Sequence, residues 1–123
     1  MKSNTDIHWL EKAETHDFPA AQSYLNLFFD EKKTHQFIEK LKAAPILKFK
    51  AKDIFRASGL SLLGISNSHV QKDVKKIKKG TALSPLLLVR QDASAKVIIA
   101  DGYHRLCAVY TFNEDTLIPC VIV

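Results

Sequence analysis

Two short apolar runs in the second half of the chain constrain its fold most. Residues 86–89 (Leu-Leu-Leu-Val) and 96–100 (Lys-Val-Ile-Ile-Ala) are joined by a polar stretch, 91–95, that is typical of a turn. Continuous apolar runs of this length predict strands that are covered on both faces. A chain with two such strands in succession must supply other elements to cover them.

The first third of the chain predicts two amphipathic helices. The first, 18–29, follows Asp17, which we expect to be its N-cap, and tolerates Pro19 in its first turn. The second begins after Asp30 and ends before Pro45, because a residue that precedes proline disfavours the helical region. The residues predicted to face the core are Ala20, Tyr24, Leu25 and Phe28 in the first helix and Phe37, Ile38, Leu41 and Ala44 in the second.

Short elements follow these helices. Residues 46–50 predict a half-buried strand, because apolar and basic residues alternate there. Residues 53–58 predict a short helix that ends at Gly59. Residues 60–66 form an apolar loop to which the pattern assigns no regular structure.

The helix between Ser68 and Gly80 has the clearest signals. Ser68 and Gln71 have the spacing of a capping box, and Gly80 supplies the stop. Its buried stripe follows from the i, i+4, i+7 spacing of Val70, Val74 and Ile77. The opposite face carries five basic or imidazole side chains: His69, Lys72, Lys75, Lys76 and Lys79.

A helix and a closing strand complete the chain. The buried stripe predicted for the helix after Gly102 consists of Tyr103, Leu106, Cys107 and Tyr110. Residues 117–123 predict a strand, with Pro119 near its start or on an edge. From residue 46 the order is strand, helix, strand, strand, helix, strand. This order predicts an α+β fold built on a small mixed sheet with flanking helices.

Composition limits the classes of protein to which the chain can belong. Its 123 residues, 46% hydrophobic and 25% charged, predict one compact domain. No apolar stretch nears the roughly 20 residues that span a bilayer, and the polar start, residues 1–9, does not resemble a signal peptide. Cys107 and Cys120 lack metal-ligand spacing. We therefore expect no tightly bound metal, no membrane partner and a reduced, cytoplasmic setting.

The net charge points to an anionic partner. The chain has 18 Lys and Arg against 13 Asp and Glu, which gives +5. Such an excess is compatible with a nucleotide, a nucleic acid or an acidic lipid as partner without choosing among them, and it is also common in proteins that bind nothing acidic.

The residues that best fit a ligand site lie at one junction. There the predicted strand 96–100 ends and a helix begins, at Asp101-Gly102-Tyr103-His104-Arg105. A helix N-terminus carries free N–H groups and a positive dipole end, so cations are locally disfavoured there. An anion, particularly phosphate, would satisfy the N–H groups together with the His104 imidazole and the Arg105 guanidinium. Gly102 would let the backbone approach this ligand closely. The alternative is that Arg105 pairs with Asp101 and His104 caps the turn.

Residues 46–123 resemble the ParB/sulfiredoxin superfamily, whose members are also described as ParB-like nuclease domains. The resemblance rests, in order, on the lysine-rich helix that ends at Gly80, 83–89 (Leu-Ser-Pro-Leu-Leu-Leu-Val), 98–108 (Ile-Ile-Ala-Asp-Gly-Tyr-His-Arg-Leu-Cys-Ala) and 118–123 (Ile-Pro-Cys-Val-Ile-Val). The whole chain is also similar to small stand-alone bacterial proteins of unassigned function. The resemblance implies a ParB/sulfiredoxin-like core at 46–123 and makes residues 1–45 an N-terminal helical extension.

The resemblance implies a site for nucleotide phosphates. In sulfiredoxins a Gly-Cys-His-Arg turn binds ATP phosphates and supplies the nucleophilic cysteine. Gly102, His104 and Arg105 match that turn, but Tyr103 stands at the cysteine position and argues against repair of sulfinic acids. In chromosome-partition ParB proteins the turn is Gly-Glu-Arg-Arg and binds CTP. No helix-turn-helix segment follows here, so we do not expect this sequence to read a DNA site.

The same resemblance places part of the lysine-rich helix at the ligand. His69, Lys72 and Lys76, at i, i+3 and i+7, match the positions that face the nucleotide. The implied cofactor is ATP or CTP with Mg²⁺. Some relatives phosphorylate free serine with an acidic residue as base, but neither Asp101 nor Asp73 matches a motif for that role. The catalytic residues stay unassigned.

Three hypotheses compete at this point. The first is a domain that binds a nucleotide or another phosphorylated small molecule, as a small kinase or nucleotide hydrolase. The second is nucleic-acid binding or nuclease action, which is less favoured because the aromatic residues fit core stripes rather than a stacking platform. The third is a non-enzymatic interaction module that forms a homodimer through its N-terminal helices.

Overall fold

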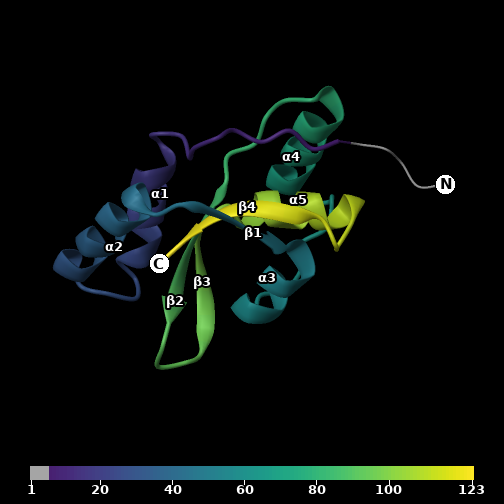
Figure 1. Cartoon of the computed structure of the whole chain (residues 1–123). Helices are drawn as coiled ribbons and strands as arrows, with labels where there is room; N and C mark the ends of the chain where they lie inside the picture. Colours follow the sequence, from purple (N-terminus) through teal and green to yellow (C-terminus); the bar gives the residue numbers. More distant parts are fainter. Residues whose placement is uncertain (1–5) are drawn as a thin grey trace.

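The computed structural model describes residues 6–123 of the chain. The first five residues of the polar start, which argued against a signal peptide, lie outside this range. The elements are α1 (Asp17–Leu25), α2 (Glu31–Ala43), β1 (Ile46–Lys50), α3 (Ala51–Ser58), α4 (Ser68–Lys79), β2 (Leu86–Gln91), β3 (Lys96–Asp101), α5 (Tyr103–Phe112) and β4 (Leu117–Ile122) (Figure 1).

The four strands form one mixed sheet in the order β1-β4-β2-β3. β4 is antiparallel to β1 and parallel to β2, whereas β2 and β3 form an antiparallel hairpin. The prediction of an α+β fold with a small mixed sheet is therefore confirmed.

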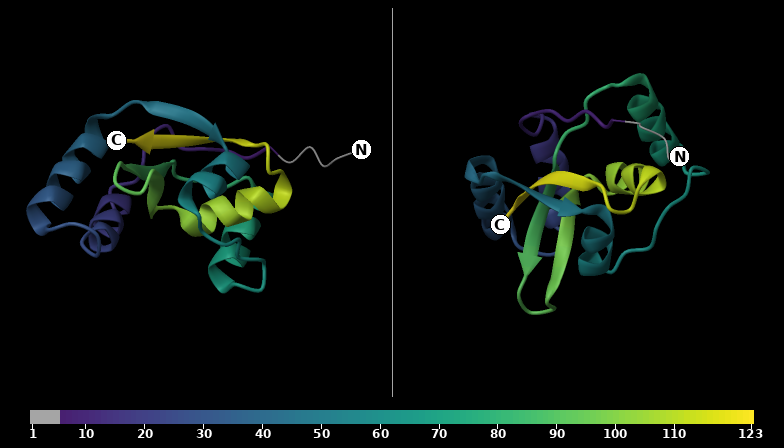
Figure 2. Two further views of the ribbon diagram at one scale, coloured as in Figure 1. Left: turned by 90° about the horizontal axis from the view of Figure 1, so that it is seen from below. Right: turned by 45° about the vertical axis from the view of Figure 1, so that its right-hand side comes forward.

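The sheet separates two hydrophobic cores, because successive strand residues point to opposite faces. On one face Leu88 and Ile99 pack with residues of α3, α4 and α5, whereas on the other Leu87 and Ile98 pack with residues of α1 and α2. In Figure 1, α1 and α2 lie on one side of the sheet and α3, α4 and α5 on the other, and both views in Figure 2 keep this separation. The helices within residues 1–45 thus complete a core that the sheet cannot close alone.

Helix α1 differs from its prediction. Asp17 is the first residue of the helix, not its N-cap, and the helix ends at Leu25 instead of continuing to Phe29. The buried face is Asp17, Ala21 and Leu25, at i, i+4 and i+8, so the predicted burial of Ala20, Tyr24 and Phe28 is wrong. The predicted stripe put only Leu25 on the correct face.

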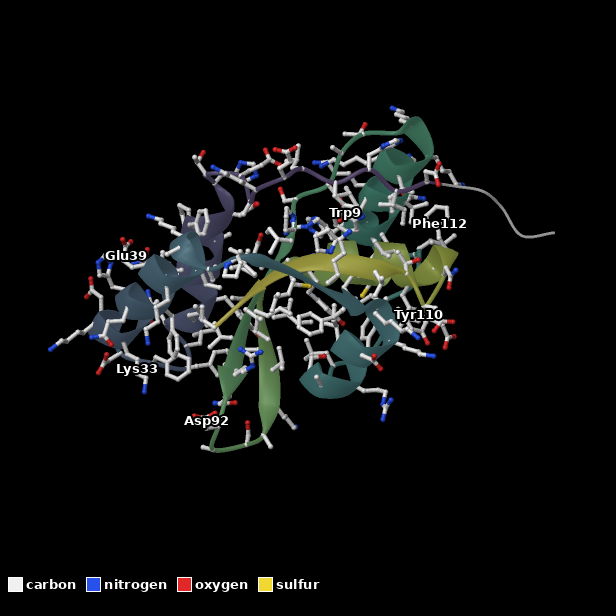
Figure 3. The ribbon with its side chains drawn as sticks, in the orientation of Figure 1. Trp9, Lys33, Glu39, Asp92, Tyr110 and Phe112 are labelled. Carbon is white, nitrogen blue, oxygen red and sulfur yellow. The ribbon has the colours of Figure 1, made fainter. Side chains whose placement is uncertain are left out.

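Helix α2 agrees with its prediction. The Asp30 side chain caps it by accepting from the Lys33 backbone N–H at 2.8 Å. Ile38 and Leu41 are buried, and the helix ends before Pro45 as expected. In Figure 3, Lys33 and Glu39 on this helix lie at the opposite end of the molecule from Tyr110 and Phe112 of α5.

Strand β1 is more exposed than predicted. It pairs with β4 alone and is an edge strand, so Ile46 and Leu47 remain 38% and 43% exposed and only Phe49 is half-buried. Helix α3 starts at Ala51, two residues earlier than predicted, and Gly59 ends it with a φ of 70°.

Helix α4 has the predicted extent and core face but a different cap. The Asn67 side chain accepts from the His69 and Val70 backbone N–H groups, so the expected capping box of Ser68 and Gln71 is wrong. Val70, Val74 and Ile77 are buried, and Gly80 adopts the left-handed conformation that ends the helix.

The apolar runs behave as predicted. Leu86 to Val89 in β2 are fully buried, and the stripe of α5 contributes Leu106 and Cys107 to the core with Tyr103 and Tyr110 half-buried against it. Pro119 is the third residue of β4. It pairs with β1, while β2 joins β4 only from Cys120 onward, so its missing N–H removes no ladder bond to β2.

Candidate functional site

Helices α4 and α5 pack against each other, and a partly open polar cavity of about 190 Å³ lies between one face of α4 and the start of α5. All eight residues predicted for a phosphate site line it, together with Asp73: His69, Lys72, Lys76, Asp101, Gly102, Tyr103, His104 and Arg105. The structure therefore brings together two segments that lie about 30 positions apart in the sequence.

Gly102 is required by packing as well as by conformation. Its φ of 111° is one that residues with a side chain rarely adopt. A Cβ here would lie 2.7 Å from Leu86 Cγ and 2.9 Å from Arg105 Nη2. The sequence argument gave Gly102 the role of letting the backbone approach a ligand. The structure shows that the absence of a Cβ instead makes room for the side chains of Leu86 and Arg105.

The first turn of α5 has backbone N–H groups that form no hydrogen bond within the helix. Gly102 is the N-cap and makes no side-chain capping bond, and Leu106 N–H is the first to bond within the helix, at 2.9 Å to the Gly102 carbonyl. No acid stands in this turn to offset the helix dipole. The N–H groups of Tyr103, His104 and Arg105 are therefore suited to an anion.

Arg105 folds back over this turn. Its Nη2 donates to Asp101 Oδ2 at 3.0 Å and to the Pro85 carbonyl at 3.4 Å. Its Nε is buried without a hydrogen-bond partner in the described part of the chain. The ion pair between Arg105 and Asp101, which the sequence analysis gave as the alternative to anion binding, is therefore present. It involves Nη2 and leaves Nε of the guanidinium without a partner among the described residues.

Two imidazoles, one from each helix, meet in the cavity. The rings of His69 and His104 lie with centroids 4.8 Å apart at a tilt of 36°. Burial lowers the pKa of His104 from its ordinary value, and the charge of His69 and that of Arg105 lower it further, against an opposing effect of Asp73. A bound anion would offset these effects and favour the protonated ring.

The low pKa of His104 predicts how stability depends on pH. Its folded-state pKa lies below the unfolded value of about 6.5, so as pH falls the unfolded chain takes up the proton first. Stability is therefore lost as pH falls through about 6.5, and His104→Asn should remove part of that loss. Urea unfolding at about pH 7.5 and about pH 5.5 measures it. His35→Asn, an exposed residue of α2, is the control, and an equal loss in all three proteins would contradict the prediction.

Tyr103 and Cys107 are held away from reactive roles. The Tyr103 hydroxyl donates to the Ser61 carbonyl of the loop before α4, and the Leu63 N–H donates to Cys107 Sγ at 3.5 Å. Burial raises the pKa of both side chains, so the thiol stays protonated and buried. This placement agrees with the argument against sulfiredoxin chemistry.

Sequence reasoning missed Asp17, which comes from the N-terminal part of the chain. It is 3% exposed, and burial together with the nearby Asp17 carboxyl raises the pKa of Asp101, against the opposing effect of Arg105. An acid at the start of a helix is usually explained as a cap. Nothing in the sequence pattern therefore connected it to a junction more than 80 residues away.

A second cavity is much less polar than the one between α4 and α5. A mainly apolar cavity of about 260 Å³ lies between α3 and the sheet, lined in part by Phe49, Ile54 and Val97. Within residues 6–123, no cluster of three or more His, Cys, Asp or Glu could hold a metal ion. Over the same range, no helix is long and apolar enough to cross a membrane.

Comparison of the chain with family models, with curated proteins and with solved structures finds no match.

Proposed function

We propose that this protein binds the phosphate groups of a nucleotide or of another phosphorylated small molecule between α4 and α5. The observation that carries the proposal is the meeting of an uncapped helix N-terminus with a cationic helix face around one polar cavity. The N–H groups of α5, the ammonium groups of Lys72 and Lys76 and the two imidazoles converge there. Phosphate oxygens accept hydrogen bonds from all of these groups.

The size of the cavity favours a compact polyphosphate. At about 190 Å³ it is smaller than the roughly 300–1,000 Å³ of pockets that enclose drug-sized ligands. Phosphates would lie inside, and the sugar and base of a nucleotide would lie outside. A long nucleic acid would instead need an extended basic groove, whereas this cavity is confined to one face of α4 and the start of α5.

The resemblance to the ParB/sulfiredoxin superfamily makes ATP or CTP with Mg²⁺ the proposed ligand, in a cytoplasmic protein. When bound, Mg²⁺ would neutralise phosphate charge alongside Lys72 and Lys76. Phosphoryl transfer or hydrolysis would require a base. Asp73 lines the cavity, whereas Asp101 is engaged with Arg105, so Asp73 is the better placed of the two acids.

A second proposal, a docking surface on the N-terminal helices, rests on exposed apolar side chains. Tyr24 in α1 and Leu27 and Phe28 in the turn after it are 38%, 80% and 45% exposed. Such a group favours contact with another protein surface, including a homodimer through these helices.

Calorimetry with phosphate, pyrophosphate, ATP, ADP, CTP and GTP, each with and without Mg²⁺, tests the phosphate site. Replacing Lys72 and Lys76 together by Ala should weaken binding about 100-fold, because each ammonium–phosphate contact is worth about 1.5 kcal/mol or more. The control, Lys75→Ala with Lys79→Ala, removes the same charge from the same helix outside the cavity and should cost no more than a few-fold.

Equal losses in the two double variants would reduce the site to a diffuse basic surface. If none of the six ligands binds, the proposal is refuted. A gel shift with DNA at graded salt, unaffected by Lys72→Ala with Lys76→Ala, would instead favour the nucleic-acid hypothesis.

A further inference from the structure

The cavity of about 260 Å³ lies between α3 and the face of the sheet that α3, α4 and α5 cover. Helix α3 packs on β3 and β1 (Figure 1). It has only eight residues, and Ala57, which lines the cavity, contributes no more than a methyl group. The short helix with its small side chain therefore leaves part of the sheet beneath it uncovered.

The wall of this cavity consists of core residues. Ile54 and Leu88 are only 3% and 2% exposed, so the cavity reaches into the hydrophobic core. Phe49, Val97 and Ile122 extend the wall and are half-buried. Voids of this size are rare in proteins, because the atoms around them lose dispersion contacts. Water would find few hydrogen-bond partners on such a wall, so an apolar group is the better occupant.

The volume of the cavity suits a small molecule. A cavity of about 150 Å³ takes up benzene, so this larger one has room for a ring or a short branched chain with a polar group attached. It is smaller than the roughly 300–1,000 Å³ that drug-sized ligands occupy. The occupant should therefore be a compact apolar group with a single polar end.

An unpaired cation stands where the cavity opens to solvent. Asp53 and Arg90, the charged residues of the lining, are both exposed. Asp53 Oδ1 lies 3.6 Å from Arg56 Nη1, in an ion pair along α3. The Arg90 guanidinium, in contrast, forms no hydrogen bond or ion pair within residues 6–123. The charges around the opening therefore leave one guanidinium to be matched by a ligand.

Arg90 is well placed to pair with a ligand in the cavity. It stands two positions after Leu88 in β2, so both side chains leave the same face of the sheet. A guanidinium matches the planar shape of a carboxylate, which it can bind through two parallel hydrogen bonds.

We propose that this cavity binds a small apolar monocarboxylate. The hydrocarbon part fills the space between α3 and the sheet, and the carboxylate pairs with Arg90. The cavity shares no lining residue with the polar cavity between α4 and α5, so the inference does not depend on the proposed phosphate site.

Carbon-13 methyl NMR with 3-phenylpropionate tests the inference, with 3-phenylpropanamide as an uncharged analogue of nearly the same shape. The methyl signals of Ile54, Leu88 and Val97 should shift saturably, with a dissociation constant of about 1 mM for so small a ligand. The amide should bind about fivefold more weakly, because it cannot form the ion pair with Arg90. Equal affinities for the two compounds, or no saturable shift of these methyl signals, would overturn the inference.

Substitution of Arg90 tests the pairing. In Arg90→Gln the carboxylate should bind about fivefold more weakly and the amide should bind within about 1.5-fold of its wild-type affinity. The control is Lys96→Gln, which removes an exposed cation of β3 that does not line the cavity, and it should change neither affinity by more than about 1.5-fold. Equal losses of carboxylate affinity in the two variants would reduce the pairing to a diffuse charge effect and overturn it.

Substitution of Ala57 tests the cavity. In Ala57→Leu the longer side chain should fill the space, abolish the methyl shifts and raise the urea midpoint of unfolding. Arg90 also lines a wider cavity beside Phe29 and Phe37, so binding that persists in Ala57→Leu would place the carboxylate there and overturn the inference. If Ala57→Leu does not fold, the Arg90→Gln comparison still decides the outcome.

The phosphate-site variant separates the two proposals. Lys72→Ala with Lys76→Ala should bind 3-phenylpropionate as the wild type does, because neither lysine lines the cavity beside α3. A loss of 3-phenylpropionate binding in this double variant would place the carboxylate between α4 and α5 and overturn the inference, even if the phosphate site is correct.

Discussion

Deleting residues 1–45 is expected to leave the rest of the chain without a cooperative fold. Leu87, Val89 and Ile98 face away from α3, α4 and α5, and their cover consists of residues from α1 and α2. Without these helices a whole face of the sheet would meet water, which few small domains tolerate. Circular dichroism and urea unfolding of the truncated chain measure the result.

Single substitutions test the same point in the full chain. Leu25→Ala, in the fully buried face of α1, should lower the free energy of unfolding by about 2–5 kcal/mol. Leu27→Ala, only two residues away but 80% exposed, should change it by less than about 0.5 kcal/mol. A truncated chain that unfolds cooperatively, or equal effects of the two substitutions, would show that residues 46–123 form an independent core.

Gly102→Ala is expected to destabilise the protein by roughly 2–6 kcal/mol, which combines backbone strain with overpacking. The left-handed φ of 111° carries one part of this cost, and the 2.7 Å approach of the new Cβ to Leu86 Cγ carries the other. Leu86 is fully buried in β2, so it has little room to move. Urea unfolding measures the change.

Gly64→Ala is the matched control for this substitution. No atom lies within 4 Å of a Cβ at Gly64, which stands in the loop between α3 and α4, and its φ is not positive. This substitution should be neutral or slightly stabilising, since it restricts the unfolded chain. Similar losses for the two glycines would mean that neither the conformation nor the packing of Gly102 is special.

The sequence predicted elements well where packing and local signals agree. Val70, Val74 and Ile77 share a face by period, and Gly80 stops the helix, so α4 could be placed from its residues alone. Helix α1 shows the opposite case. Its periodicity suggested an aromatic buried face, but the helix turns Asp17 and Ala21 inward, and this rotation depends on contacts with β3 that the local pattern does not contain.

The candidate site divides in the same way. The family resemblance, not spacing alone, predicted that His69, Lys72 and Lys76 lie near the turn at Gly102, and these residues do line one cavity. The sequence left the ion pair between Asp101 and Arg105 as an alternative to anion binding, and the structure contains this pair. The burial of Asp17 depends on α1 packing against β3, so only the tertiary structure could reveal it.

The most direct measurement for the central proposal is a proton–nitrogen NMR titration with pyrophosphate. A phosphate held by the uncapped start of α5 should shift the backbone amides of Tyr103, His104 and Arg105 saturably, with the same affinity as the signals of Lys72 and Lys76. Shifts of that kind, lost in Lys72→Ala with Lys76→Ala, are the result we predict. Amide signals of α5 that stay unmoved while lysine signals across the surface drift without saturation would contradict it.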